Sequence, residues 1–200
     1  MYIIGLTGGM GSGKGYCSKI FANHGIKSLD TDLVSRDVCK AGSDFLASLA
    51  ARFGDHIINP DGSLNRKALA EIAFASEGNT SDLNAITHKY IIAECKSWLN
   101  ARRDAGDFAA IIDAPLLYES GLDSICDYVV AVIADDELRI SRAMERDNIT
   151  RDQAIARMQK QKDNSFFISN ADFVISNNDT DDVISQIDLV IETIVSKSKQ

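Results

Sequence analysis

Five short apolar runs recur along the chain, and their length is typical of buried β-strands. They span residues 2–6, 26–29, 108–112, 128–133 and 173–176. Helical patterns separate them, and strands that alternate with helices usually build a parallel sheet with helices on its faces. The pattern of apolar and polar positions therefore predicts an α/β fold.

The helical patterns place apolar residues at intervals of three and four positions. They cover residues 14–24, 33–40, 43–53, 66–74, 84–103, 135–146 and 183–194. A capping box at residues 150–153 opens one more short helix, and Gly25 ends the first helix. Residues 59–62 are typical of a turn, residues 77–80 of a loop and residues 196–200 of a solvated tail.

Residues 33–103 contain helices and turns alone, which is too long for one crossover between parallel strands. We therefore expect a helical insertion that covers the substrate side of a cleft, within a single domain of 200 residues. The core of this domain is expected to consist of residues 1–32, 104–138 and 166–200, and residues 139–165 are expected to form a lid.

The first predicted strand runs directly into a glycine-rich stretch, GGMGSGK, and then into a helix. Residues 8–14 fit G-x-x-x-x-G-K, in which backbone N–H groups and the positive end of a helix dipole surround phosphate oxygens. The glycines let the backbone turn tightly, and Lys14 adds a mobile cation for the outer phosphates. The alternative is a tight turn without a ligand. The residues that we expect to bind the nucleotide here are Gly9, Gly11, Ser12, Gly13, Lys14, Gly15 and Tyr16.

One position departs from this pattern. The lysine is normally followed by Ser or Thr, whose hydroxyl binds Mg²⁺, but residue 15 is a glycine without a side-chain oxygen. Water or another hydroxyl would complete the shell of the metal, or the site would be weakened; Ser18 and Thr7 are the nearest hydroxyls in the sequence. The metal ligands stay open, and we expect Mg²⁺ near Gly15, Ser18 and Asp113.

Two carboxylates, Asp30 and Asp32, follow the second predicted strand and point to the same side of it. Ligands of parallel α/β sheets bind at the carboxyl ends of the strands, so we expect Asp32 to share a cleft with the phosphate loop. The alternative is that one of these acids caps the next helix, which does not exclude a catalytic role. Arg36, one turn further on, would bind a substrate phosphate or pair with an acid.

Further candidate residues lie in the insertion and after the third predicted strand. His88 is a lone histidine on a helix, which is more often structural than catalytic, and a substrate contact is the alternative. Asp113 would hold the water shell of a metal ion or cap the following segment. In the apolar loop at residues 116–121 we expect Leu117 and Glu119 to bind substrate, and Glu119 has metal binding as its alternative.

Arg139, Arg142 and Arg146 share one face of a helix because they are spaced by three and four residues. A basic stripe after a strand end favours a lid that neutralises the charge of a transferring phosphoryl group. The alternative is a solvated helix face paired with neighbouring acids. Asn177 follows the fifth predicted strand, where it could read the edge of a nucleobase.

Composition limits the classes of partner. The formal net charge is −8 and the sequence pI is about 4.8, which argues against nonspecific binding to nucleic acid or to anionic membranes. The sequence shows neither a signal peptide nor a membrane span. Its cysteines form no C-x-x-C pair and are typical of reduced thiols. We therefore expect a cytoplasmic protein, and we expect it to be a monomer or a weak homo-oligomer.

Seven segments, taken in order, resemble the dephospho-coenzyme A kinase family. They are GLTGGMGSGK at 5–14, LDTDLVSR at 29–36, NRKALAEIAF at 65–74, LNAITH at 83–88, IIDAPLLYESGL at 111–122, RAMERD at 142–147, and Gln161 followed by ADFVISN at 171–177. The phosphate loop alone occurs in many kinases. The DTD, PLLYES and RAMERD segments in this order are far more specific.

The resemblance implies a three-layer P-loop fold with a five-stranded parallel sheet, a helical substrate-binding insertion and a helical lid. It also implies phosphorylation of the ribose 3′-hydroxyl of dephospho-CoA, with ATP and Mg²⁺. At the matching positions it implies that Asp32 is the catalytic base, that Lys14 and the loop amides hold the phosphates, and that Arg142 and Arg146 act from the lid.

The chain departs from the family pattern at three places. Gly15 and Tyr16 replace a Ser-Thr pair, Lys89 replaces a proline, and residues 164–168 contain no lysine where the family usually has one. Two other functions stay open: a kinase of another small metabolite, such as a nucleoside monophosphate, and a catalytically weak nucleotide-binding regulator.

Overall fold

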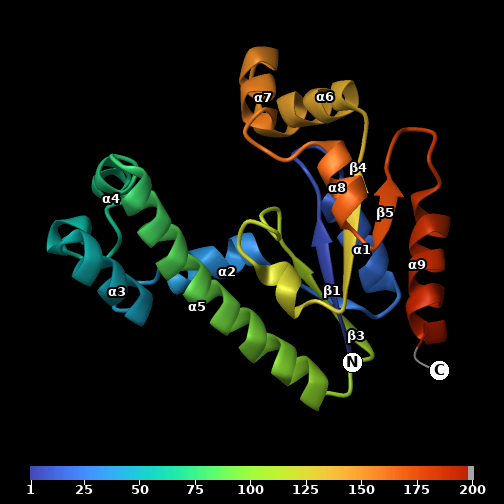
Figure 1. Ribbon diagram of the computed structural model, residues 1–200, viewed down its shortest axis with the longest axis horizontal. Coiled ribbons are helices and arrows are strands. Elements are labelled where there is room, and N and C mark those ends of the chain that lie inside the picture. Colours follow the sequence, from blue (N-terminus) through green and yellow to red (C-terminus); the bar gives the residue numbers. More distant parts are fainter. Residues whose placement is uncertain (198–200) are drawn as a thin grey trace. The chain divides into compact units, whose positions relative to one another are not determined.

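In the computed structural model, which describes residues 1–197, strands and helices alternate in the order that the apolar pattern predicts (Figure 1). The strands are β1 (Tyr2–Thr7), β2 (Lys27–Asp30), β3 (Ala109–Asp113), β4 (Tyr128–Ile133) and β5 (Phe173–Ser176). They form one sheet in the order β2-β3-β1-β4-β5, in which β1 runs parallel to β3 and β4, and β4 runs parallel to β5. The predicted five-stranded parallel sheet is confirmed.

The α-helices cover most of the predicted ranges. They are α1 (Lys14–Asn23), α2 (Thr31–Val38), α3 (Asp44–Phe53), α4 (Arg66–Ala73), α5 (Glu77–Asp104), α6 (Asp136–Asp147), α7 (Arg151–Met158), α8 (Asn164–Asn170) and α9 (Val183–Lys197). Two 3₁₀ turns, η1 (Asp55–Ile57) and η2 (Leu122–Ile125), lie between them. The predicted tail at 196–200 falls partly on α9, and residues 198–200 lie outside the described residues.

Side-chain caps set several helix boundaries. The capping box is present: Thr150 accepts from the N–H of Gln153, and the Gln153 side chain accepts from the N–H of Thr150. The prediction of a loop at residues 77–80 is wrong, because Ser76 caps α5 by accepting the Asn79 N–H, so the helix begins at Glu77. The sequence prediction also missed α8, which Asp163 caps.

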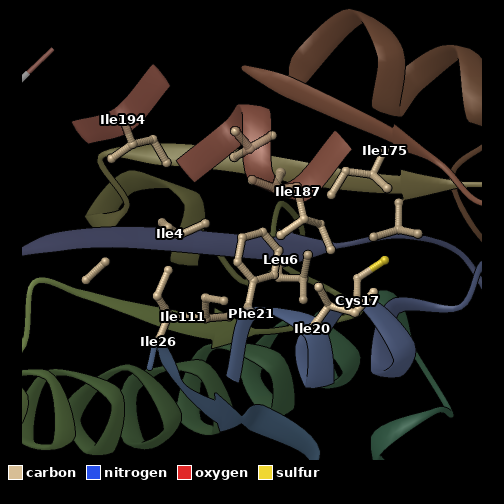
Figure 2. Close-up of a cluster of buried hydrophobic side chains, with 14 of the residues drawn as sticks. Ile4, Leu6, Cys17, Ile20, Phe21, Ile26, Ile111, Ile175, Ile187 and Ile194 are labelled. Carbon is tan, nitrogen blue, oxygen red and sulfur yellow. The ribbon is translucent and has the colours of Figure 1, made fainter. Parts of the chain in front are cut away.

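The described chain divides into two compact units, one made of residues 1–28 and 106–197 and the other of Leu29–Ala105. In the first unit, apolar side chains of β1, α1 and α9 pack together around the sheet, among them Leu6, Phe21 and Ile187 (Figure 2). The second unit has its own core, in which Phe45, Leu49 and other residues of α3, α4 and η1 are buried. Each unit therefore has a separate apolar core. None of the described helices combines the length and the apolar character that crossing a membrane requires.

Candidate nucleotide-binding site

The phosphate loop connects β1 to α1 and presents unpaired backbone donors. Gly13 is the residue before α1, and the Ser12 N–H donates to the Gly9 carbonyl at 3.1 Å, which closes a tight turn. The N–H groups of Gly11, Gly13 and Gly15 find no acceptor among residues 1–197. Free N–H groups at the start of a helix form an anion-binding site, as the motif predicts.

Two of the loop glycines are required by their backbone and by their neighbours. Gly13 has φ +91°, and an added Cβ would lie 1.9 Å from Nδ2 of Asn177. Gly11 has φ +77°, and an added Cβ would lie 2.3 Å from the carbonyl oxygen of Arg139. Any larger residue would be strained at these positions and would also displace the chain that packs against the loop.

Two hydroxyls at the loop are buried without a partner. Thr7 ends β1 and Ser12 lies within the loop, and no described residue hydrogen-bonds to Thr7 Oγ1 or Ser12 Oγ. A buried hydroxyl without a partner costs about 1–3 kcal/mol, so such groups usually pair with water or a ligand. Together with the unpaired N–H groups, these hydroxyls fit an oxygen-rich ligand such as a nucleotide phosphate.

Lys14 forms an ion pair with Asp113, which is 6% exposed at the end of β3. β3 is the neighbour of β1 in the sheet, and Asp113 is in register with Leu6, so the fold itself brings the carboxylate to the loop. The sequence predicted Asp113 for a metal shell or a cap but missed the pair with Lys14. A signal was present, since Asp113 follows a predicted strand and Lys14 belongs to the loop after another, and ligand sites of parallel sheets form at the carboxyl ends of the strands.

Asn177 ties the phosphate loop to the end of β5. Its side-chain Nδ2 donates to the carbonyl oxygen of Ser12 at 2.8 Å. Its backbone carbonyl oxygen accepts from Nη1 of Arg142 at 2.9 Å. Nη2 of Arg142 donates to Oδ1 of Asp179 at 3.4 Å. The side-chain amide of Asn177 is therefore engaged with the loop, and its contact with a nucleobase stays a prediction.

The three arginines of α6 do not form a uniform basic stripe. Arg139 is 2% exposed and donates to the Met10 carbonyl, so the alternative of a solvated helix face is wrong for this residue, and its role in a lid stays a prediction. Arg146 is bound to Asp147, and this hydrogen bond lowers the pKa of the Asp147 carboxyl. For Arg146 the structure thus records the pairing with a neighbouring acid that was the alternative. Helical spacing groups residues on a face but does not reveal what packs against that face.

The hydroxyl and acidic residues expected near a metal are only partly at the loop. Ser18 Oγ donates to Ser28 Oγ at 3.0 Å, which engages it with β2. Apart from its two chain neighbours and the backbone of α1, no described residue lies within 4 Å of where a Cβ on Gly15 would be, and Tyr16 is half-exposed. Within residues 1–197 no group of three or more His, Cys, Asp or Glu side chains could hold a metal. A metal at this loop would thus depend on oxygens of the nucleotide.

The candidates of the helical insertion lie in the other compact unit. Asp30 caps α2 by accepting from the N–H groups of Asp32 and Leu33 at 2.8 and 3.4 Å. The Asp32 carboxylate is exposed and has no hydrogen-bond partner in the part of the chain that the structure describes. Arg36 is exposed, and His88 is half-buried, which lowers the pKa of its imidazole. The approach of these residues to the phosphate loop stays a prediction.

The loop at residues 116–121 exposes other side chains than expected. Leu117 is completely buried, and its Cδ2 would lie 2.8 Å from a Cβ on Gly5, so its side chain belongs to the core. Its neighbour Leu116 is exposed, and so is Glu119. The Leu117 side chain thus offers no exposed surface to a substrate. The substrate-binding role of Glu119 stays a prediction.

The helical unit also contains a cavity of about 570 Å³ that the sequence did not indicate. Apolar and aromatic side chains line it, among them Val34, Phe45 and Trp98 from three different helices. Asp37 and Glu94 add carboxylates to its wall. Lys40 and Asp44 also line it, so the wall mixes apolar and charged side chains, and a cavity of this size with several polar groups is a candidate ligand site.

Residues 2–182 match the family model described as dephospho-CoA kinase. The chain belongs to the dephospho-CoA kinase family. It is 40% identical over 198 residues to the dephospho-CoA kinase of Corynebacterium glutamicum, which covers 98% of this chain and 99% of that protein.

Solved structures agree with this family. The dephospho-CoA kinase from Campylobacter jejuni has a TM-score of 0.68 at 26% identity, covering 99% of this chain and 98% of that one. A structure from Thermus thermophilus has a TM-score of 0.78 at 23% identity and covers 98% of this chain and 97% of that one, which supports the fold. The resemblance that the sequence motifs indicated is therefore confirmed.

Proposed function

We propose that this protein is a dephospho-CoA kinase, which transfers the γ-phosphoryl group of ATP to the ribose 3′-hydroxyl of dephospho-CoA. The family match across residues 2–182 supports the reaction. The observation that carries the proposal is the phosphate loop, whose free N–H groups, unpaired hydroxyls and Lys14 converge between β1 and α1.

The first task of the site is to hold the phosphates. The N–H groups of Gly11, Gly13 and Gly15 would donate to phosphate oxygens, and Lys14 would neutralise charge that spreads over the transferring group. Asp113, paired with Lys14, keeps the ammonium group at the loop. Arg142, already at the edge of the loop through Asn177, would add a second cation from α6.

Mg²⁺ fits this site through Asp113, the hydroxyls of Thr7 and Ser12, and the nucleotide itself, since hard oxygen ligands are those it prefers. When bound, Mg²⁺ supplies further neutralisation of the phosphate charge. Gly15 contributes no side-chain oxygen, so this protein would hold the ion with one ligand fewer than the usual motif provides.

Asp32 is proposed as the base that accepts the proton of the attacking 3′-hydroxyl. Asp30 takes the capping role at α2, which leaves the carboxylate of Asp32 without a structural task. Arg36 and His88 would bind the acceptor, and the cavity beside Phe45 and Trp98, whose wall mixes apolar and charged side chains, would take the amide-containing arm of dephospho-CoA.

The test is ATP-dependent phosphorylation of dephospho-CoA by the purified protein with Mg²⁺. We expect coenzyme A and ADP in equal amounts, with the new phosphate on the 3′-oxygen as read by NMR. Nucleoside monophosphates, offered as acceptors in the same assay, test the alternative that this protein is a kinase of another small metabolite. ADP release with these acceptors, but not with dephospho-CoA, would overturn the proposal.

A second candidate, a catalytically weak nucleotide-binding regulator, is favoured by one observation. Gly15 removes the usual metal ligand, and no atom of the described residues fills the space beside it. This candidate predicts that ATP binds without turnover on any acceptor, so calorimetry and the assay above separate the two. A cytoplasmic location is proposed from the composition and the cysteine pattern, and a monomer or weak homo-oligomer is proposed as the state of assembly.

A further inference from the structure

Met10, in the middle of the phosphate loop, is attached at three points to the segment that contains α6, α7 and the turn after α7. Its N–H donates to Oε1 of Gln161 at 2.8 Å, and its carbonyl accepts from Nε of Arg139 at 3.0 Å. Its side chain packs against a small apolar cluster of that segment, made of Ile140, Ala143 and Ala154 with their neighbours. A single loop residue is thus held through its donor, its acceptor and its side chain.

Both polar side chains are themselves held in place. Arg139 is buried, and its Nη1 also donates to Asp136 at 2.9 Å. Its Nη2 lies so close to the loop that a Cβ on Gly9 would be 2.2 Å away. Gln161 lies in the turn that ends α7, where its N–H donates to the Met158 carbonyl at 2.9 Å. A buried cation with several partners and a side chain on a closed turn have little freedom to move.

These bonds fix two successive peptide planes of the loop. The Gly9–Met10 plane is held at both ends, because the Gly9 carbonyl accepts from Ser12 and the Met10 N–H donates to Gln161. The next plane carries the Met10 carbonyl and the Gly11 N–H on opposite sides, since the peptide is planar and trans. The bond from Arg139 to this carbonyl therefore aims the Gly11 N–H, which has no acceptor among residues 1–197, in the opposite direction.

From this geometry we infer that Gln161 and Arg139 are positioning residues for nucleotide binding, which hold the peptide planes around Met10 so that the Gly11 N–H is preset to receive a phosphate oxygen. Neither side chain needs to touch the nucleotide. The inference rests on the proposed function for the identity of the nucleotide. It also links the α6–α7 segment to the loop, so that a displacement of one would change the donors of the other.

The test compares Gln161→Met with Gln159→Met. Gln159 lies in the same turn, is exposed, and makes no side-chain hydrogen bond within the described residues, so it is a matched control. We expect Gln161→Met to weaken ADP binding about tenfold by calorimetry, the size of one lost hydrogen bond. The Met10 amide should then exchange faster with solvent by NMR, and the thermal midpoint should stay within about 3 °C of the parent protein. Gln161→Glu keeps an acceptor and should restore the protection of the Met10 amide.

An unchanged ADP affinity in Gln161→Met, with a Met10 amide that has lost its protection, would overturn the inference. Rapid exchange of this amide in the unaltered protein would also overturn it, and that measurement does not depend on a variant that folds. ADP binding needs no acceptor, so a failure to phosphorylate dephospho-CoA would contradict the proposed function and leave this test intact.

Discussion

Gly15 lies at the start of α1 with its Cα exposed and open space on the side where a Cβ would project. A serine fits there without displacing any described atom, and its hydroxyl would supply the oxygen that the motif normally provides. We expect Gly15→Ser to lower the Mg²⁺ concentration for half-maximal rate by a factor on the order of three to ten. This factor corresponds to the free energy that one added polar contact usually contributes.

Gly15→Ala is the matched control for this prediction, because it fills the same space without an oxygen. Steady-state rates over a Mg²⁺ titration check both variants. An equal shift in the alanine variant would mean that helix propensity, which favours Ala over Gly, causes the effect. No shift in either variant would mean that another ligand already occupies the position.

Cys17 lies in α1 just after the phosphate loop, and burial raises the pKa of its thiol to about 12. Burial also raises the pKa of Cys95, to about 11. The thiolate is the reactive form, and at pH 8 the buried thiol of Cys17 is almost entirely protonated. We expect both thiols to resist a maleimide at pH 8 in the folded protein and to react once denaturant exposes them.

Mass spectrometry of labelled peptides measures this reaction at each cysteine. Labelling of Cys17 in the folded protein at the rate of the unfolded chain would contradict the prediction, since it would require α1 to open. Added ADP should leave Cys17 unlabelled as well, because the nucleotide is expected at the helix start and not in the core.

At the scale of elements, the 28-residue helix α5 depends on a cap that the sequence prediction overlooked. Ser76 Oγ accepts from the Asn79 N–H at 3.2 Å, which satisfies one of the free donors of the first turn. We expect Ser76→Ala to lower the free energy of unfolding by about 1 kcal/mol. Ser81→Ala, at an exposed position of the same helix, should be nearly neutral or slightly stabilising.

Urea unfolding followed by circular dichroism measures both variants, and equal losses would show that the cap contributes nothing specific. The same comparison would detect fraying of the first turn of α5. This turn precedes the half-buried His88 by about three helical turns, so substrate affinity should change little in either variant.

Elements with a strong local signal could be predicted from the sequence. The apolar runs predicted all five strands, and the Thr150 capping box predicted the start of α7. In both cases the residues that determine the structure lie within a few positions of each other. The start of α5 was missed because Gly78 and its polar neighbours hide the helical period. The capping serine was the available signal.

For the candidate site too, features with a local cause could be predicted, and features that depend on distant contacts were missed. The motif places the anion site between β1 and α1, since the chemistry of the loop is local. The pair of Lys14 with Asp113, the burial of Arg139 and the bond from Met10 to Gln161 join residues far apart in the chain. Such contacts follow from sheet order and helix packing, which periodicity does not reveal.

At the scale of the whole molecule, the proposed reaction needs residues from both compact units. Lys14 and the phosphate loop belong to the unit built on the sheet, whereas Asp32 belongs to the unit Leu29–Ala105. If Asp32 is the base, its removal must affect the transfer step and not the binding of the nucleotide. We expect Asp32→Asn to lower kcat by on the order of 10²–10⁴, the usual worth of a general base, while the Kd for ADP changes by less than about twofold.

Asp30→Asn provides the matched control for this experiment, because it makes the same substitution two residues earlier. Asparagine caps a helix about as well as aspartate, so the bonds to the N–H groups of Asp32 and Leu33 should survive, and turnover should stay near that of the parent. Equal losses in both variants would assign the defect to α2 and not to a base. Asp32→Asn could instead lose ADP affinity as strongly as it loses turnover. That result would mean that Asp32 supports nucleotide binding, and it would contradict the proposed role of Asp32 as the base.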